Sequence, residues 1–228
     1  MSVIKISNLT KIYNKTQVPV HAVNGINLTI GEGEFVAIVG PSGCGKTTLM
    51  NMIGGLEEPT SGSVEINETN ISTLTSNQRI NFRLQNIGFI FQSYNLIPVL
   101  TSKENVAFIM QLQNKPKKEI EERTIQLLQS VGLGSKINSK PNQMSGGEQQ
   151  RVAVARALAS KPKFVLADEP TANLDSKATT QLLDIMKKLN EEENMTFIFT
   201  THDQRVVDKA RRIITLEDGK VISDKLIG

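Results

Sequence analysis

A glycine-rich segment at residues 40–49, with the sequence Gly-Pro-Ser-Gly-Cys-Gly-Lys-Thr-Thr-Leu, constrains the fold of this chain more than any other feature. Its first eight residues match the pattern G-x-x-x-x-G-K-[ST], in which glycines let the backbone curl until successive N–H groups face one phosphate. In this pattern Lys46 supplies a positive charge to the β- and γ-phosphates, and the Thr47 hydroxyl is a ligand for Mg²⁺. An apolar run at 35–39 before the segment and a helical pattern after it give the strand–loop–helix context that the motif requires. The predicted phosphate-binding residues, the phosphate loop, are Gly40, Pro41, Ser42, Gly43, Cys44, Gly45, Lys46, Thr47 and Thr48.

The single cysteine, Cys44, occupies a variable position of that motif, and we interpret it as a small tolerated residue rather than a reactive thiol. One cysteine excludes an internal disulfide framework and a multi-cysteine metal site, and it is typical of a reducing compartment. The 228 residues suffice for a sizeable core, and the formal net charge of +3 is too small to indicate a polyanionic partner. With no Trp and two Tyr, and with the basic run Lys115–Lys118 interpreted as a solvated helical face, no nucleic-acid partner is expected.

No segment of the sequence is predicted to cross a membrane. The longest apolar stretches, such as 35–39 and 164–167, are far shorter than the about 18 residues that a spanning helix needs. The first residues, Met-Ser-Val-Ile-Lys-Ile-Ser-Asn, lack the continuous apolar region of a secretory signal. We therefore expect a cytoplasmic chain, and any membrane role must come through a partner.

Strand and helix patterns alternate along the chain in a way typical of an α/β fold with a mostly parallel sheet. Short Val- and Ile-rich runs separated by turn residues predict strands, namely 3–6, 22–30, 35–39, 63–66, 164–167 and 196–200. Later in the chain, a helix is predicted over 176–190, and then a short helix and a terminal hairpin around Asp218–Gly219.

The middle of the chain is predicted to be mostly helical. Thr101–Glu104 fits a capping box, an amphipathic helix follows Pro116, and a further helix begins near Ser145. We therefore predict a single domain over residues 1–228. Its core is formed by approximately 1–92 and 159–228, and a helical lobe at approximately 93–158 is inserted into it.

Two acidic residues, Asp168 and Glu169, follow the apolar run Phe164–Ala167. Ligands in an open α/β sheet bind at the carboxyl ends of the strands, which is where this pair is predicted. We expect Asp168 to hold Mg²⁺ or its water, and Glu169 to orient and deprotonate an attacking water. The alternative, a pair of solvated acids at a strand end, explains the pair alone equally well but leaves its place beside a phosphate loop unexplained.

The segment Met144–Arg151, Met-Ser-Gly-Gly-Glu-Gln-Gln-Arg, is the most specific motif in the chain, and we call it the signature. Together with the phosphate loop and Asp168–Glu169, in this order along nearly the whole chain, it resembles the ATP-binding-cassette (ABC) ATPase family. The chain departs from the commonest pattern at Met144 and Glu148, where the family has Leu and Gln, and neither change removes the Ser or Gly contacts. Ser145-x-x-Glu148 also fits a capping box, a structural interpretation that is compatible with an anion site at a helix start.

Four further positions match motifs of the family. Tyr13 matches the aromatic residue against adenine, and Gln92 matches the glutamine that joins the core to the helical lobe. Asn173–Asp175 matches the loop that crosses to the other protomer, and Thr201–Asp203 matches the segment with the switch histidine. The alternatives are a partly buried surface aromatic for Tyr13 and an inert loop histidine for His202.

The resemblance implies a P-loop NTPase (RecA-like) core with an N-terminal antiparallel β subdomain and an inserted α-helical subdomain. It also implies ATP hydrolysis, with Glu169 as the catalytic base and His202 in contact with the γ-phosphate of ATP bound with Mg²⁺. Because one chain holds one phosphate loop and one signature, the family's arrangement needs a second copy, head to tail, with two ATP at the interface. The implied metal-binding residues are Thr47, Gln92 and Asp168. The implied nucleotide-contacting residues outside the phosphate loop are Tyr13, Gln92, Ser145, Gly146, Gly147, Glu148 and Asp175.

The run at 89–101 and the segment Thr201–Asp203 are similar to the branch of the family that serves lipoprotein release, macrolide efflux and antimicrobial-peptide export. This favours an ATPase subunit, peripheral on the inner face of the cell membrane, that drives a separate integral membrane permease docked in a groove near 94–100. The alternative is a soluble ABC ATPase in DNA repair or translation, but the chain has neither a long coiled-coil insert nor a second cassette. A P-loop kinase or GTPase would leave Ser145–Gly147 without a role.

Overall fold

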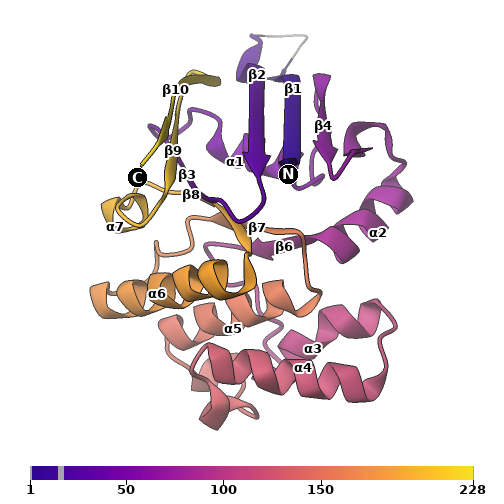
Figure 1. Cartoon of the computed structure of the whole chain (residues 1–228), viewed down its shortest axis with the longest axis vertical. Coiled ribbons are helices and arrows are strands. Elements are labelled where there is room, and N and C mark those ends of the chain that lie inside the picture. Colours follow the sequence, from indigo (N-terminus) through magenta and orange to yellow (C-terminus); the bar gives the residue numbers. More distant parts are fainter. Residues whose placement is uncertain (1, 15–17, 228) are drawn as a thin grey trace.

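The computed structural model describes residues 2–14 and 18–227. Its first sheet is antiparallel, with the order β2-β1-β4-β5, and Figure 1 shows three of its strands side by side at the top of the molecule. The strands are β1 (Ser2–Tyr13), β2 (Val20–Gly31), β4 (Ser61–Ile66) and β5 (Thr69–Asn70). Ile4 and Ile6 are buried while Lys5 between them is exposed, which is the two-residue period of a strand with one face on a core. This sheet is the N-terminal antiparallel β subdomain that the resemblance implies.

The second sheet is larger and has the order β10-β9-β3-β8-β7-β6. Its neighbours pair in parallel except β9 and β10, which form the predicted terminal hairpin. The strands are β3 (Phe35–Val39), β6 (Ile87–Ile90), β7 (Phe164–Asp168), β8 (Thr196–Thr200), β9 (Arg212–Glu217) and β10 (Lys220–Leu226). The hairpin turns at Asp218 and Gly219, which both have positive φ, as a two-residue turn of the favoured hand requires.

Helices alternate with the strands along the chain. They are α1 (Lys46–Ile53), α2 (Ser76–Asn86), α3 (Ser102–Leu112), α4 (Lys117–Ser130), α5 (Gly146–Ala159), α6 (Ser176–Glu193) and α7 (Gln204–Val207). In Figure 1, α3, α4 and α5 pack together below the second sheet, and α6 lies above α5. Capping boxes begin α2, α3 and α5, including those predicted at Thr101 and Ser145. Within the described part of the chain, no helix combines the length and apolar character needed to cross a membrane.

Apolar clusters lie on both faces of the second sheet. Phe197 and Phe199 of β8 pack with the inner sides of α3 to α6, whereas Ile198 between them packs with α1 and the first sheet. All of Phe164–Ala167 and Thr196–Thr200 are buried, because both faces of these parallel strands are covered. The loops at the carboxyl ends of the strands are therefore anchored between two packed layers. The α/β fold class predicted from the sequence is confirmed.

The structure adds elements that the sequence pattern does not predict. α2 buries Arg79 rather than a stripe of apolar side chains, so its sequence has no clear helical periodicity. β6 has only four residues, too few for a clear strand pattern. β1 also extends well beyond the predicted 3–6, through several register shifts against β2. α3 and α4 lie within 93–158 and α5 ends one residue beyond it, at Ala159, and the boundaries of that helical lobe stay a prediction.

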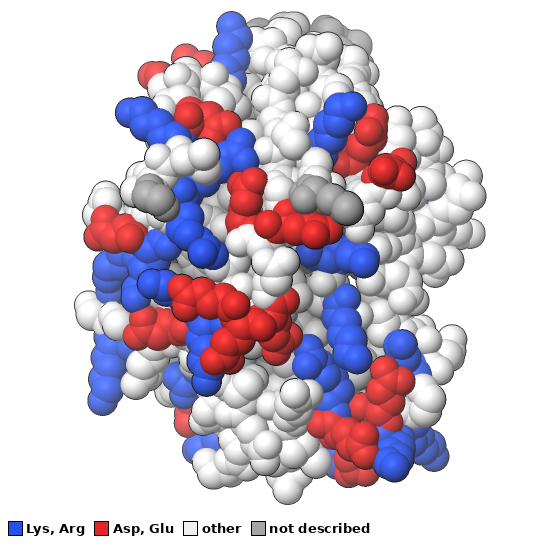
Figure 2. Space-filling model, in the orientation of Figure 1, with Lys and Arg blue, Asp and Glu red and all other residues white. Residues whose placement is uncertain are grey.

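Charged side chains of both signs are interleaved over the face shown in Figure 2. At the start of α4, Lys115 lies 3.6 Å from Glu119, and Lys118 lies 3.9 Å from Glu122, each pair one helical turn apart. These side chains are exposed, so the basic run forms the solvated helical face that the sequence predicts.

Candidate functional site

The phosphate loop connects β3 to α1. Gly45 has a φ of 104° and precedes α1 as an N-cap without a side-chain cap. A Cβ on Gly45 would lie 2.0 Å from the Ala22 carbonyl oxygen, and one on Gly40 would lie 2.1 Å from the Leu216 carbonyl oxygen, so these positions require glycine. The first turn of α1 therefore presents backbone N–H groups with no side-chain cap, which suits an anion.

Lys46 and Cys44 complete the loop. The Lys46 ammonium donates to the carbonyl oxygens of Gly40 at 2.8 Å and Pro41 at 3.0 Å, so the positive charge lies against the start of the loop. The charged oxygen of a bound phosphate would be a stronger acceptor for Lys46 than these neutral carbonyls. Cys44 is buried, with its Sγ 3.9 Å from the Lys46 Nζ, which fits its interpretation as a small packed residue.

Thr47 and Asp168 bring two oxygen donors together at the carboxyl edge of the second sheet. The Thr47 Oγ1 lies 3.5 and 3.4 Å from the two Asp168 carboxylate oxygens, and the Thr200 hydroxyl donates to Asp168 and orients it. Mg²⁺ prefers oxygen ligands and is usually held by one or two protein groups together with phosphates and water. The described residues contain no group of three or more His, Cys, Asp or Glu side chains placed to hold a metal. The pair therefore fits a Mg²⁺ ion that is shared with a bound nucleotide.

Glu169 and His202 form a second pair at the same edge. The His202 Nδ1 lies 2.8 Å from the Glu169 Oε1, while the Glu169 Oε2 is buried without a hydrogen-bond partner among the described residues. Glu169 has a φ of 46°, an uncommon conformation for a non-glycine residue, and its N–H donates to the Thr200 carbonyl at 3.0 Å. One oxygen of the carboxylate is therefore held by His202, and the other makes no hydrogen bond within the described residues.

Asp203 fixes the loop that carries His202. Its carboxylate accepts hydrogen bonds from the Arg205 Nε at 2.9 Å and Nη2 at 2.7 Å, and these bonds hold the pKa of Asp203 below its usual range. The Thr171 hydroxyl also donates to Asp203 at 3.2 Å. The segment after β7 is therefore tied to the segment after β8.

The signature begins α5 as a capping box. The Ser145 hydroxyl accepts from the Glu148 N–H at 3.3 Å, and the Glu148 carboxylate accepts from the Ser145 N–H at 2.8 Å. The second bond holds the pKa of Glu148 below its usual range. A Cβ on Gly146 would lie 2.7 Å from the Tyr94 hydroxyl oxygen, and one on Gly147 would lie 2.9 Å from a side chain of α6. The glycines therefore let the start of α5 pack closely against its neighbours.

Asp175 lies beside the signature. A surface cavity of about 380 Å³ is lined by Ser145, Gly147, Glu148, Arg151, Asp175, Lys177, Ala178 and Gln181. Within the chain the Asp175 carboxylate caps α6, because it accepts from the Ala178 N–H at 2.8 Å. Its contact with a second protomer stays a prediction.

Tyr13, the last residue of β1, is held by two residues that the sequence motifs miss. Its hydroxyl donates to the Glu57 carboxylate at 2.6 Å, and the Lys11 ammonium lies 2.9 Å from that carboxylate and 5.2 Å from the centre of the Tyr13 ring. Burial, and then the bond to Glu57, raises the pKa of the Tyr13 hydroxyl. Lys11 and Glu57 belong to no motif, so only the pairing of β1 with distant parts of the chain shows their role.

Gln92 follows β6 and lies close to the segment after β7. Its backbone carbonyl accepts from the Asn173 side-chain amide at 2.9 Å. Its side chain is exposed, and no hydrogen bond in the described part of the chain joins it to Thr47 or Asp168. A role for Gln92 as a metal ligand stays a prediction.

The predicted site residues form two separate groups. The sheet-edge group lies beside the phosphate loop and consists of Thr47, Asp168, Glu169 and His202. The signature group consists of Ser145, Gly147, Glu148 and Asp175. Within residues 2–14 and 18–227, no hydrogen bond or ion pair joins the signature group to the phosphate loop.

Comparisons with known proteins agree with these features. The family model described as ABC transporter matches residues 23–172. An uncharacterized ABC transporter ATP-binding protein of Methanocaldococcus jannaschii is 47% identical to this chain over 96% of the chain and 97% of that protein. The ATP-binding protein LolD of a lipoprotein-releasing system in Legionella pneumophila is 41% identical over 93% of the chain and 94% of that protein.

A solved structure is also similar to this chain in both sequence and fold. It is described as the dimeric, post-hydrolysis state of the ATP-binding cassette MJ0796 bound to ADP and Pi, and that cassette is also from Methanocaldococcus jannaschii. It matches with a TM-score of 0.90 and 42% identity, over 99% of each chain. This chain therefore belongs to the ABC transporter family, as an ATP-binding subunit whose reaction is ATP hydrolysis.

Proposed function

We propose that the chain hydrolyses ATP as a head-to-tail dimer, with two ATP molecules between the copies, and that this drives a separate membrane permease. The separation of the two groups of site residues carries the proposal. In one chain, no hydrogen bond or ion pair among the described residues joins the signature group to the phosphate loop or the sheet-edge group, and the cavity of the signature group opens to solvent. In a head-to-tail pair, each signature meets the phosphates held by the other copy. The description of the MJ0796 structure as a dimer with ADP and Pi supports this arrangement.

Glu169 is the proposed catalytic base, because it directly follows Asp168 at the carboxyl edge of the sheet and its carboxylate is oriented by His202 through Oε1. Lys46 exchanges its bonds to the loop carbonyls for bonds to phosphate oxygens. Thr47, Asp168 and Gln92 are the proposed ligands of Mg²⁺, which when bound offsets charge on the phosphates. Catalysis is then mainly positioning and electrostatic stabilisation, so closure of the dimer assembles the site.

The start of α5 is the proposed contact of the partner copy with the γ-phosphate. Ser145, Gly146 and Gly147 present a hydroxyl and backbone N–H groups at the positive end of a helix, where an anion is stabilised. Glu148 holds this start in shape through the capping box. Asp175, which lines the same cavity, is the proposed contact with the other protomer.

Tyr13 is the proposed contact for adenine. The half-buried ring is fixed by Glu57 and Lys11, which lowers the entropy lost when a flat base packs against it. His202 is proposed to move from Glu169 toward the γ-phosphate when ATP binds, because one imidazole can donate one hydrogen bond and accept another.

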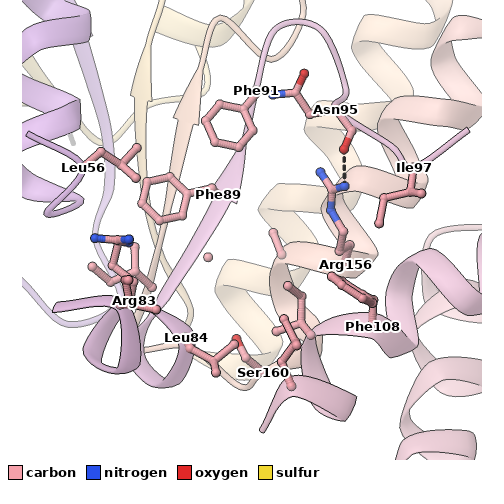
Figure 3. Close-up of a pocket in the computed structure, with 16 residues that line it drawn as sticks. Leu56, Arg83, Leu84, Phe89, Phe91, Asn95, Ile97, Phe108, Arg156 and Ser160 are labelled. Atoms are coloured by element: carbon pink, nitrogen blue, oxygen red, sulfur yellow. Dashed lines mark hydrogen bonds between the residues drawn. The ribbon is translucent and has the colours of Figure 1, made fainter. Parts of the chain in front are cut away.

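The permease is proposed to dock in an apolar groove between β6, α2, α3 and α5. The groove has a volume of about 460 Å³, and Asn95 and Ile97 from the predicted 94–100 segment line it. Figure 3 shows Phe89 and Phe91 on one side of the groove and Phe108 and Arg156 on the other. Exposed apolar side chains also contribute, namely Leu56, Ile80, Phe108 and Leu112. A short permease helix with apolar residues on one side would fit this shape.

This docking would hold the chain peripherally on the inner face of the cell membrane. The name of the similar Legionella protein supports the branch that serves lipoprotein release. The reported relatives are transporter ATP-binding proteins and give no support to the alternative role in DNA repair or translation.

Glu169→Gln tests the proposal, because it removes the base and keeps the shape of the side chain. We expect this variant to bind ATP with Mg²⁺, to form a stable dimer by size exclusion with light scattering, and to lose at least about 10²-fold in kcat. The unaltered chain should form the same dimer only transiently. Normal turnover by the variant would refute the role of Glu169, and a monomer with saturating ATP would refute the dimer.

A further inference from the structure

Gln150, in the second turn of α5, is a fully buried amide, with 0% of its surface exposed. Its Nε2 donates to the carbonyl oxygen of Pro170 at 2.7 Å and to that of Phe91 at 3.4 Å. Its Oε1 is buried without a hydrogen-bond partner among the described residues. An apolar side chain would fill the same space without a lone buried acceptor, so the value of Gln150 lies in the two bonds that it donates.

Both acceptors of Gln150 adjoin residues of the proposed site. Pro170 directly follows Glu169, whose backbone is strained at a φ of 46° and needs its surroundings to hold it there. Phe91 directly precedes Gln92. One amide nitrogen therefore forms a clamp, because it bonds to the chain just after β6 and just after β7. Only the NH₂ end of the side chain can make these bonds, because both partners are carbonyl oxygens.

A second side chain of α5 holds the far end of the loop after β6. The Arg156 guanidinium donates to the Tyr94 carbonyl at 2.8 Å and to the Asn95 carbonyl, the bond drawn in Figure 3. Tyr94 and Asn95 both have positive φ, 58° and 50°. The loop that carries Gln92 is thus fastened to α5 on both sides.

We propose that Gln150 is a positioning residue for ATP hydrolysis. It fixes the positions of Glu169 and Gln92 relative to each other and to α5, the helix that begins with the signature, and it does not touch the nucleotide itself. The inference rests on the proposed role of Glu169 as the base. A shift of α5 when the signature meets the partner's nucleotide is then transmitted through Gln150 to the backbone of the base. Loss of the clamp should lower the catalytic rate and leave ATP binding intact.

Gln150→Glu tests this directly, because it replaces the donor nitrogen by oxygen with almost no change in shape. We expect kcat to fall at least about 10-fold, since small misplacements of a catalytic group are costly. The Kd for ATP, measured by isothermal titration, should stay within about 2-fold, because the phosphate loop is untouched. The introduced carboxyl group can donate one bond when it is protonated, so the activity of the variant relative to the unaltered chain should rise as the pH is lowered from about 8 to about 6.

Gln113→Glu is the matched control. The Gln113 amide also donates to a backbone carbonyl, that of Leu84 at 3.0 Å, and its Oε1 is likewise buried without a partner in the described residues, but it lies between α3 and α2, outside the proposed site. We expect this control to keep the kcat of the unaltered chain.

Three results would overturn the inference: an unchanged kcat in Gln150→Glu, an equal loss in Gln113→Glu, or a loss of ATP affinity as large as the loss of kcat. If Gln150→Glu does not fold, Gln150→Leu provides the test, because it removes both hydrogen bonds without adding a charge. An unchanged kcat in Gln150→Leu would likewise contradict the inference. An unaltered chain without ATPase activity would instead overturn the proposed function, and the inference with it.

Discussion

At the scale of single residues, the two adjacent acids at the end of β7 have different surroundings, and we therefore propose different roles for them. Asp168 continues the strand, is oriented by Thr200, and faces the Thr47 hydroxyl. Glu169 turns out of the strand through its positive φ, and one of its oxygens meets His202. These surroundings are the basis for proposing Asp168 as a Mg²⁺ ligand and Glu169 as the catalytic base.

Asp168→Asn should weaken the Mg²⁺ dependence of hydrolysis, because an amide removes one negative charge from the pair of oxygen donors. We expect the Mg²⁺ concentration for half-maximal ATPase rate to rise about 10- to 100-fold, as for other losses around metal ligands. Asp184→Asn is the control, since Asp184 pairs with Lys209 on an exposed face of α6. An unaltered Mg²⁺ titration in Asp168→Asn would rule out this residue as a ligand.

Residues in compact motifs could be predicted from the sequence, because the chemistry of a phosphate loop or a capped helix start depends on neighbours a few positions apart. Lys46, Asp168 and Ser145 are of this kind. Glu57 lies outside every motif, since it acts on a segment that is brought close only by the fold. Gln150 lies within the signature, but its bonds to Phe91 and Pro170 also come only from the fold, so the motif contains the residue without indicating its contacts. No local pattern separates Glu57 from an ordinary surface glutamate.

At the scale of elements, Arg212 ties the C-terminal hairpin to the rest of the second sheet. Its guanidinium donates to the Asp224 carboxylate at 2.8 and 2.7 Å and to Glu34 at 2.8 Å. The bonds from Arg212 hold the pKa of Asp224 below its usual range. β10 is therefore fixed against β9 by a two-pronged ion pair as well as by backbone bonds.

Asp224→Asn should lower the free energy of unfolding at pH 7 by about 0.5–1 kcal/mol, a modest value because the carboxylate is partly exposed and screened by solvent. A carboxyl whose pKa is lower in the folded state stabilises the fold above its unfolded pKa of about 3.9, and this contribution is lost as the pH falls through the folded value. The difference between the variant and the unaltered chain should therefore shrink below about pH 4. Urea unfolding at several pH values measures it, with Glu217→Gln on the same hairpin as the control. If the difference in free energy of unfolding between Asp224→Asn and the unaltered chain stays constant with pH, the ion pair with Arg212 is not its cause.

The helical periodicity of α6 and the turn residues Asp218–Gly219 of the terminal hairpin allowed these two elements to be predicted, whereas α2 and β6 could not be predicted. α6 has an apolar stripe over most of its length, with Leu182, Leu183, Met186 and Leu189 buried. α2 instead buries Arg79, which pairs with Glu58, so its helical state comes from the capping box and tertiary contacts. Tertiary context thus sets the elements whose sequence has no periodic pattern.

At the scale of the whole molecule, one chain holds only separate parts of the proposed ATPase site. Its phosphate loop and sheet-edge group lie at one edge of the second sheet, and its signature group lies at the starts of α5 and α6. No hydrogen bond or ion pair between these groups occurs in the described part of the chain. Two copies related head to tail would complete two sites at once, and the apolar groove beside β6 is the proposed docking site for a permease. The clamp at Gln150 connects these regions through α5.

Mixing two inactive variants tests the shared site most directly. Lys46→Ala removes the charge of the phosphate loop, and Ser145→Asp keeps a helix cap but sets a negative charge against the phosphate. In a head-to-tail pair of the two variants, one site has both defects and the other has none. An equal mixture should therefore recover up to about a quarter of the unaltered ATPase rate, since half of the dimers are mixed and each has one intact site. A mixture as inactive as either variant alone would contradict a site built from two chains.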